Sequence, residues 1–265
     1  MTTNLLKEIG AKYRTDKVDH GYMDVYYDYF FPFRYKDINI LEIGVYNGSS
    51  ILTWREFFPK AHIVGLDIED KALLFNQIPG LNSFYMGDQG DRKQLMFMCE
   101  MVNAETGKGF DIIIDDGSHF QHDLMVSFGC MFPYINSGGI YILEDMATPS
   151  RLAESPVRGN WWGSPDENHQ NSRLPGIAAT VGAPKQWLPN GKKDLFHCAR
   201  TTMERFEATG IMTNAFLTDQ ECQYISDNTD DVKVYEAFVP PIKGSSSIAI
   251  VTKKQYKQHK EGIVL

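Results

Sequence analysis

The sequence predicts an α/β protein with a doubly wound, Rossmann-like sheet that is mostly parallel, carries helices on both faces and ends in an antiparallel C-terminal hairpin. Two observations predict this fold. Between residues 38 and 144, short apolar runs alternate with amphipathic segments, as in successive strand and helix units. Acidic or polar residues follow four of these apolar runs, where the loops of a parallel sheet gather and ligands bind.

The alternation defines five expected strands and four expected helices. We expect strands over residues 38–43, 62–67, 83–86, 110–115 and 139–144. Between them we expect helices over residues 50–58, 71–77, 92–102 and 119–132. Parallel neighbours need a crossover of about a dozen residues or more, so strands joined by such helices are expected to run parallel.

The residues before this alternation differ from it in character. Residues 1–36 begin with an amphipathic segment and continue through a polar, aromatic stretch. Such a pattern favours a helical lead-in or lid in front of a main domain over residues 37–265.

The residues after the fifth strand break the alternation. Residues 146–194 hold six of the chain's twelve prolines and three of its four tryptophans, which predicts a packed substrate loop at about 147–194. A helix over about 194–210 is expected next. Two strands, over 232–239 and 246–252, are then close enough in sequence to form the hairpin.

Length, charge and cysteines limit the class of protein. The 265 residues fit one elaborated α/β domain. A formal net charge of −8 argues against a nucleic-acid partner, since non-specific affinity for phosphates comes from clustered Lys and Arg. No apolar run approaches the roughly 18 residues that cross a bilayer, and the four cysteines lack CxxC spacing. We therefore expect a cytoplasmic protein with a small-molecule partner and no nucleic-acid or membrane partner, and a homo-oligomer stays open.

The first expected strand leads into a glycine-containing turn. Glu42 is followed by Gly44, Gly48, Ser49 and Ser50, where a helix is expected to begin. Glycines let a ligand approach the backbone closely, and a helix N-terminus offers free N–H groups. The G-x-x-x-G spacing differs from the G-x-G-x-x-G that seats a pyrophosphate, which favours a cofactor without one. A tight turn that binds nothing explains this signature equally well.

The next strand ends extend the pattern. Asp67 ends the second strand, twenty-three residues after Gly44, where a carboxylate can accept hydrogen bonds from both hydroxyls of a ribose. Asp88 and Gln89 follow the third strand and are placed to contact an adenine edge, and Asp115 ends the fourth. Solvated loop starts predict no such regularity, so the combination favours an adenosyl cofactor.

Three more carboxylates follow the fourth and fifth strands, namely Asp116, Glu144 and Asp145. Successive strand residues point to opposite faces, so Asp115 is expected to face the cofactor and Asp116 a metal ion. Neighbouring strands lie about 4.8 Å apart, which brings Asp116 close to the Glu144-Asp145 pair if the two strands are adjacent. Three carboxylates suit Mg²⁺ or a similar hard divalent cation and do not suit zinc.

His119 lies just behind the fourth strand, at the expected start of a helix. Imidazole is the usual general base near neutral pH, and a cation that binds a hydroxyl lowers its pKa. Beside the three carboxylates, His119 is therefore expected to be the catalytic base. Taken singly, His119 is explained by a hydrogen bond to its own turn, and Glu144 and Asp145 by a strand end that faces water. His122 is expected to support the site or only the fold, and Tyr141 to lie in the core.

The motifs also resemble those of a known group of enzymes. The segments that carry the resemblance are Leu41 to Gly44, Gly65 to Asp67, Gly87 to Gln89, Phe110 to His119 and Gly138 to Asp145. On these residues the chain resembles the class I S-adenosylmethionine-dependent methyltransferases. More narrowly, it resembles the metal-dependent macrolide-sugar O-methyltransferases of the mycinamicin type. The resemblance covers about residues 12–146.

The resemblance implies a role for each motif. S-adenosylmethionine would be held by the turn from Gly44 to Ser50 and by Asp67, Asp88, Gln89 and the Asp115 region. Magnesium would be held by Asp116, Glu144 and Asp145, with His119 as the base. Thr15, Asp16 and Lys17 would help to close the cofactor or substrate pocket.

The resulting expectation is an S-adenosylmethionine- and Mg²⁺-dependent O-methyltransferase that acts on a hydroxyl of a sugar or a sugar-containing small metabolite. Two alternatives stay open: a protein of the same fold that binds an adenosyl cofactor without methyl transfer, and an O-methyltransferase of a catechol-like diol. A nucleotide-dependent oxidoreductase is disfavoured because G-x-G-x-x-G is missing.

Overall fold

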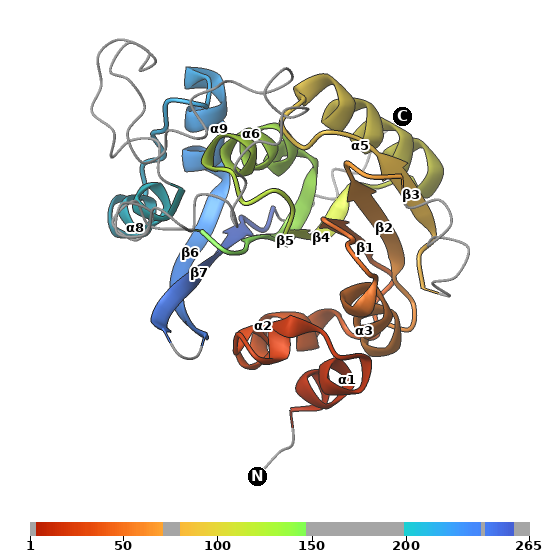
Figure 1. Cartoon of the computed structure of the whole chain (residues 1–265). Helices are drawn as coiled ribbons and strands as arrows, with labels where there is room; N and C mark the ends of the chain where they lie inside the picture. Colours follow the sequence, from red (N-terminus) through yellow and green to blue (C-terminus); the bar gives the residue numbers. More distant parts are fainter. Residues whose placement is uncertain (1–3, 71–79, 147–198, 240–241, 257–265) are drawn as a thin grey trace.

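The computed structural model of the chain (Figure 1) describes residues 4–70, 80–146, 199–239 and 242–256. The helix expected over 71–77 and the substrate loop expected at about 147–194 lie outside these residues. So does the start of the helix expected over about 194–210.

Seven strands form one sheet in the order β3-β2-β1-β4-β5-β7-β6. Their bounds are β1 Asn39–Ile43, β2 His62–Asp67, β3 Ser83–Met86, β4 Phe110–Asp115, β5 Ile135–Leu143, β6 Thr229–Val239 and β7 Ile242–Lys253. The first five strands run parallel to one another, whereas β7 runs antiparallel to β5 and β6. This arrangement confirms the fold class that the sequence predicts.

The direction of chain building reverses between β1 and β4. From β1 the chain adds β2 and β3 on one side, and then returns to add β4 and β5 on the other. In open α/β sheets such a reversal leaves a crevice at the carboxyl ends of the two central strands, which is where ligands bind.

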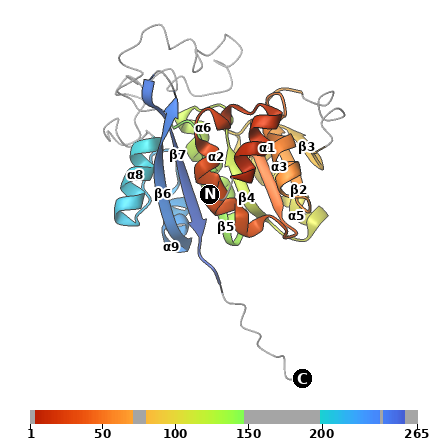
Figure 2. The same ribbon diagram turned by 90° about the horizontal axis from the view of Figure 1, so that it is seen from below.

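Helices cover both faces of the sheet (Figures 1 and 2). One face carries α1 Leu5–Tyr13, α2 Tyr22–Phe30 and α3 Ser49–Phe57. The other face carries α5 Arg92–Thr106, α6 Gln121–Met131, α8 Ala199–Thr209 and α9 Asp219–Asn228. Short 3₁₀ segments extend three of the connections, namely η1 Asp16–Val18, η2 Phe31–Phe33 and η3 Phe132–Tyr134.

Alternate residues of each strand enter two separate cores. Leu41 of β1 and Ile113 of β4 belong to the core under α5 and α6, whereas Ile40 and Ile112 belong to the core that contains Trp54 of α3. The period of two along a strand causes this division. It also decides which helices each polar side chain at a strand end will meet.

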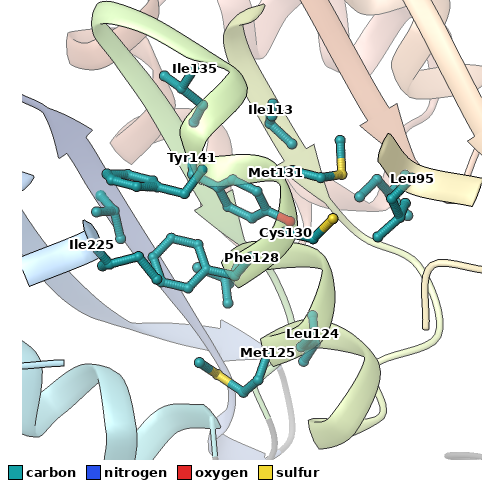
Figure 3. Close-up of a cluster of buried hydrophobic side chains, with 14 of the residues drawn as sticks. Leu95, Ile113, Leu124, Met125, Phe128, Cys130, Met131, Ile135, Tyr141 and Ile225 are labelled. Carbon is teal, nitrogen blue, oxygen red and sulfur yellow. The ribbon is translucent and has the colours of Figure 1, made fainter. Parts of the chain in front are cut away.

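Figure 3 shows the core on the α6 side. Phe128 of α6 packs edge-on against Tyr141 of β5, with ring centroids 5.0 Å apart. Ile225 of α9 and Leu95 of α5 close the same cluster. Tyr141 is fully buried here, as expected.

Local chemistry sets the ends of α5. The Asp91 side chain accepts hydrogen bonds from the backbone N–H groups of Lys93 and Gln94, which satisfies donors that have no partner within the helix. Gly107 ends the helix in the left-handed conformation, with φ of 75°, which glycine adopts without strain.

Two elements differ from the sequence-based expectation. The helix α9 was not expected, although Thr218 and Glu221 form a capping box at its start, a signal that the sequence carries. The helix α6 begins at Gln121, so His119 lies in the loop before it. His119 has φ of +55°, a left-handed conformation that no α-helix contains. Among the described residues, no helix is both long enough and apolar enough to cross a membrane.

Candidate active site

A cavity of about 500 Å³ lies at the carboxyl ends of the central strands, at the reversal between β1 and β4. Its walls come from the N-terminal segment, the β1 and β2 turns, the loop after β3 and the loops after β4 and β5. They comprise Arg14, Thr15, Asp16, Lys17, Ile43, Gly44, Val45, Tyr46, Asn47, Ser49, Ser50, Leu66, Asp67, Ile68, Glu69, Gly87, Gln89, Asp116, Gly117, Ser118, His119, Phe120 and Asp145.

Backbone strain is concentrated at this cavity. Four described residues other than glycine have positive φ, namely Arg14, Tyr46, His119 and Asp145, and all four line the cavity. A non-glycine residue in the left-handed region is destabilising by roughly 1–2 kcal/mol, and such residues cluster at functional sites. The location of this strain therefore indicates that the cavity is the functional site.

The turn after β1 is held by Asp67, at the end of β2. Its Oδ2 accepts hydrogen bonds from the backbone N–H groups of Val45 (3.0 Å) and Tyr46 (3.1 Å). Its Oδ1 accepts one from Glu69 N–H at 3.0 Å. Asp67 thus lines the cavity, as its expected ribose contact requires, and also shapes the turn beside it.

The two glycines of the turn serve different purposes. Gly44 has φ of +86° and lines the cavity, and a Cβ on it would lie 2.7 Å from the carbonyl carbon of Asp116. Gly48 has φ of +81° and precedes the first residue of α3, but it is not among the lining residues. Ser49 and Ser50, which begin α3, do line the cavity.

Glu42 lies away from the cofactor site expected for it. Strand alternation turns its side chain to the α3 side, where it is fully buried and is not among the lining residues. Its Oε2 accepts hydrogen bonds from Ser50 Oγ at 2.8 Å and Trp54 Nε1 at 3.1 Å. Burial raises the pKa of Glu42 to about 7, against the opposing effect of the Lys17 ammonium.

Asp115 also differs from the expectation that it faces the cofactor. It is fully buried on the α6 side, where it accepts hydrogen bonds from Ser127, from Tyr141 at 3.0 Å and from Gln89 Nε2 at 3.0 Å. Burial raises its pKa to about 6, although these hydrogen bonds oppose the rise. Asp115 does not line the cavity but supports Gln89, which does.

Gln89 connects Asp115 to the loop after β4. Its Oε1 accepts a hydrogen bond from Ser118 N–H at 2.6 Å, and a side chain at Gly117 would collide with it. Its neighbour Asp88 is instead used locally, because its Oδ1 accepts from Gly90 N–H at 2.8 Å and it is not among the lining residues.

His122 lies one turn beyond His119 and outside the cavity lining. Its Nδ1 is 3.0 Å from Oδ1 of Asp123, and its ring packs edge-on against Phe216. Asp123 in turn accepts a hydrogen bond from Ser118 Oγ at 2.7 Å. His122 therefore belongs to the polar support beneath the loop that carries His119.

Three potential ligand groups converge at one end of the cavity. One ligand atom from each of Asp116, His119 and Asp145 lies within 4.8 Å of the others. His119 Nε2 is 3.7 Å from Asp116 Oδ1 and 3.9 Å from Asp145 Oδ2. The expected adjacency of strands four and five is present, because Asp115 pairs with Leu143 and Glu144 N–H donates to Asp115 O.

Glu144 is oriented differently from its two expected co-ligands. Its side chain faces the N-terminal segment, where Oε1 accepts from Tyr26 OH at 2.6 Å and Oε2 from Lys17 Nζ at 2.8 Å. Burial and the nearby Asp116 raise the pKa of Glu144 well above its ordinary value, against the effect of Lys17. Strand alternation again explains the direction, since Ile142 belongs to the same core as Tyr26.

Lys17, expected to help close the cofactor or substrate pocket, lines the cavity beside Asp116. Only 1% of this residue is exposed, and its ammonium contacts Asp116 Oδ2, Glu144 Oε2 and, at 3.8 Å, Glu42 Oε1. Burial alone would lower its pKa, but the three carboxylates outweigh burial and raise the pKa well above its ordinary value. Thr15, also buried, and Asp16 line the adjoining wall.

The balance of charge tests whether a divalent cation fits this site. Three carboxylates, those of Glu42, Asp116 and Glu144, contact the ammonium of Lys17, and the carboxylate of Asp145 lies 3.9 Å from His119 Nε2. Uncompensated carboxylates in a buried place are strongly destabilising, and hard divalent cations prefer oxygen ligands. This set of oxygen donors therefore fits a divalent cation, which would compensate the negative charge that Lys17 does not neutralise.

Sequence reasoning missed two residues of this site. Tyr22 and Tyr26 of α2 donate hydrogen bonds from their hydroxyls to Asp145 and Glu144, and both rings are buried. Their spacing of four residues places them on one face of a helix, a pattern that the sequence contains. Nothing in the sequence alone indicates which carboxylates they meet.

The fold is that of the Rossmann-like methyltransferases. The MycE methyltransferase of the mycinamycin biosynthetic pathway, solved in complex with Mg and SAH, superposes with a TM-score of 0.61 at 24% sequence identity. The superposition covers 98% of this chain and 56% of MycE.

Sequence comparison finds relatives that are named as O-methyltransferases, although no protein-family model matches the chain. The mycinamicin VI 2''-O-methyltransferase of Micromonospora griseorubida is 35% identical over 153 residues, which are 54% of this chain and 36% of the relative. The 8-demethyl-8-alpha-L-rhamnosyl tetracenomycin-C 2'-O-methyltransferase of Streptomyces olivaceus is 32% identical over 136 residues, 49% of this chain and 34% of the relative. The match thus spans about a third of each relative, and it confirms the resemblance to sugar O-methyltransferases.

Proposed function

We propose that this chain is an S-adenosylmethionine- and Mg²⁺-dependent O-methyltransferase that acts on a hydroxyl of a sugar or a sugar-containing small metabolite. One observation carries the proposal. A single cavity joins the turn held by Asp67 to the converging groups of Asp116, His119 and Asp145. A methyl donor at the first place and an acceptor hydroxyl at the second would then meet within one cavity.

The cofactor end uses the residues of the β1 and β2 loops. Gly44, Ser49 and Ser50 offer backbone that a ligand can approach, and Asp67 offers carboxylate oxygens to ribose hydroxyls. Gln89 and Thr15 line the same cavity and complete this set. Glu42, Gly48, Asp88 and Asp115 do not line the cavity and would support the residues that do.

The cation would be held by Asp116 and Asp145, with Glu144 as a third ligand. Each carboxylate oxygen has two lone pairs, so an oxygen of Glu144 that accepts one hydrogen bond still has a ligand position. A bound Mg²⁺ supplies Lewis acidity that lowers the pKa of an acceptor hydroxyl.

His119 would remove the proton of the acceptor hydroxyl at Nε2. The carboxylates of Asp116 and Asp145, 3.7 and 3.9 Å away, stabilise the imidazolium that results. The hydroxyl oxygen forms its bond to the methyl carbon as the bond from that carbon to sulfur breaks, and S-adenosylhomocysteine leaves. Because the methyl group of a sulfonium is already electrophilic, the protein needs only to align the two centres.

The proposed acceptor rests on the relatives, since the tetracenomycin enzyme is named for O-methylation of a rhamnosyl compound. A catechol-like diol satisfies the same cation chemistry and is therefore an outcome of the test. We further propose a cytoplasmic protein with no nucleic-acid partner, since the net charge is −8 and the cysteines Cys99 and Cys130 are buried and free.

The test is calorimetry with S-adenosylhomocysteine and NAD⁺, followed by methyl transfer from labelled S-adenosylmethionine to glycosides and catechols. We expect the protein to bind S-adenosylhomocysteine and not NAD⁺. We also expect methyl transfer to a glycoside, which a chelator should abolish and Mg²⁺ should restore. Full methyl transfer without a divalent cation would rule out the proposed cation-dependent mechanism. Binding without any transfer would leave an adenosyl-binding protein, and transfer to catechols alone would replace the sugar.

A further inference from the structure

The N-terminal segment supplies three hydrogen-bond donors to the acidic residues at the cavity. Lys17 comes from η1, and Tyr22 and Tyr26 come from α2, which lies on the face of the sheet opposite α6 (Figure 1). Lys17 donates to Asp116 and Glu144, Tyr22 to Asp145 and Tyr26 to Glu144. Each candidate ligand carboxylate thus has at least one donor from a segment more than ninety residues away in the sequence.

The oxygens of Asp116 and Asp145 are divided in the same way. Asp116 Oδ2 accepts from Lys17, and its Oδ1 lies toward His119 Nε2. Asp145 Oδ1 accepts from Tyr22, and its Oδ2 lies toward the same nitrogen. In each of these two carboxylates, one oxygen is therefore held by the N-terminal segment. The other oxygen faces the position that the two carboxylates share with His119 Nε2.

We propose that Lys17, Tyr22 and Tyr26 are positioning residues that determine which carboxylate oxygens face the cation. This inference rests on the cation site of the proposed function. It assigns the N-terminal helices to the support of that site, in addition to closing the cavity.

The packing of α2 makes the two tyrosines rigid donors. Tyr22 and Tyr26 are buried, and their rings stack with centroids 6.1 Å apart. Tyr26 also packs against Phe30 and Trp54, with ring centroids 5.0 and 6.3 Å away. Rings held in this way lose little further entropy when they orient a carboxylate, and groups that orient metal ligands typically change affinity by about 10- to 100-fold when removed.

The experiment measures the affinity of the full chain for Mn²⁺, a paramagnetic substitute for Mg²⁺, from the electron paramagnetic resonance signal of free Mn²⁺. The variants are Tyr22→Phe and Tyr26→Phe, which keep the buried rings and remove only the hydroxyls. The matched control is Tyr13→Phe, because Tyr13 OH donates to the carboxylate of Glu56 at 2.6 Å, outside the cavity lining. Lys17→Arg, which keeps the charge, is a third variant with a different risk to folding.

We expect Tyr22→Phe, Tyr26→Phe and Lys17→Arg each to weaken Mn²⁺ binding by about tenfold or more, while Tyr13→Phe binds like the wild type. Thermal unfolding in chelator should show all four variants folded. Unchanged affinity in all three site variants, or equal weakening in the control, would overturn the inference. A wild-type chain that binds no Mn²⁺ would overturn both this inference and the proposed cation site. Normal Mn²⁺ binding without methyl transfer would count against the proposed function alone.

Discussion

Gly44 lies directly against the backbone of Asp116. A Cβ on Gly44 would overlap the carbonyl oxygen of Asp116 and would lie 2.9 Å from Gly117 Cα. The turn after β1 and the loop after β4 therefore meet at a residue that has no side chain. This contact makes Gly44 a requirement of the fold as well as a place where a ligand can approach.

We predict that Gly44→Ala destabilises the protein far more than Gly107→Ala does. Both glycines have similar φ, +86° and +75°, but a Cβ on Gly107 meets nothing within 4 Å. The control should lose about 1 kcal/mol, the cost of left-handed backbone alone, and Gly44→Ala about 3 kcal/mol or more. Urea unfolding measures both, and equal losses would show that Asp116 tolerates the methyl group. Gly44→Ala should also weaken the binding of S-adenosylhomocysteine.

His119→Ala tests the base. If His119 Nε2 takes the proton of the acceptor, kcat should fall by about 10²- to 10⁴-fold. The affinity for S-adenosylhomocysteine, which is proposed to bind at the other end of the cavity, should stay unchanged. His62→Ala is the control, because His62 begins β2 and lies near Ser83 and Glu105, away from the cavity. Undiminished kcat in His119→Ala would remove His119 as the base.

Glu42 should make stability depend on pH. Burial raises its pKa from 4.5 to about 7, so the folded state binds a proton more tightly than the unfolded state does. Its contribution is fully present below pH 4.5 and is lost as the pH rises through about 7. A rise of the pKa from 4.5 to about 7 corresponds to a loss on the order of 3 kcal/mol.

The measurement is urea unfolding in chelator across this pH range. The wild type should lose stability relative to Glu42→Gln as the pH rises, because glutamine does not titrate. Glu56→Gln, at an exposed site on α3, should keep the wild-type dependence. The same slope in wild type and Glu42→Gln would show that Glu42 does not cause it.

Lys17→Met should destabilise the protein mainly in the absence of a divalent cation. Its removal leaves the buried carboxylates of Asp116 and Glu144 without their ammonium, and breaking a buried pair in this way typically destabilises by about 3–5 kcal/mol. Saturating Mg²⁺ should reduce the loss, since the cation replaces part of the missing charge. Lys12→Met, which removes an exposed pair with Glu56, should have little effect in either condition. A loss that Mg²⁺ leaves unchanged would argue against a cation beside Lys17.

The sequence by itself determined the sheet and the edge of the sheet where the site lies. Hydrophobic periodicity is a local property, so the apolar runs ending at Asp67 and Asp115 could be identified as strands without knowing their neighbours. Carboxyl ends of parallel strands share one edge, which placed Asp116 beside Glu144. The capping box that begins α9 was an equally local signal, but it was left unused.

Only the tertiary structure decided which partners the side chains at that edge meet. Alternation places Asp115 and Glu144 on opposite faces, but the face that carries α2 and the face that carries α6 depend on how the chain crosses the sheet. Tyr22 contacts Asp145 across 123 residues, and Lys17 contacts Glu144 across 127. No local pattern encodes such contacts, because they form only when the buried face of α2 packs on the folded sheet.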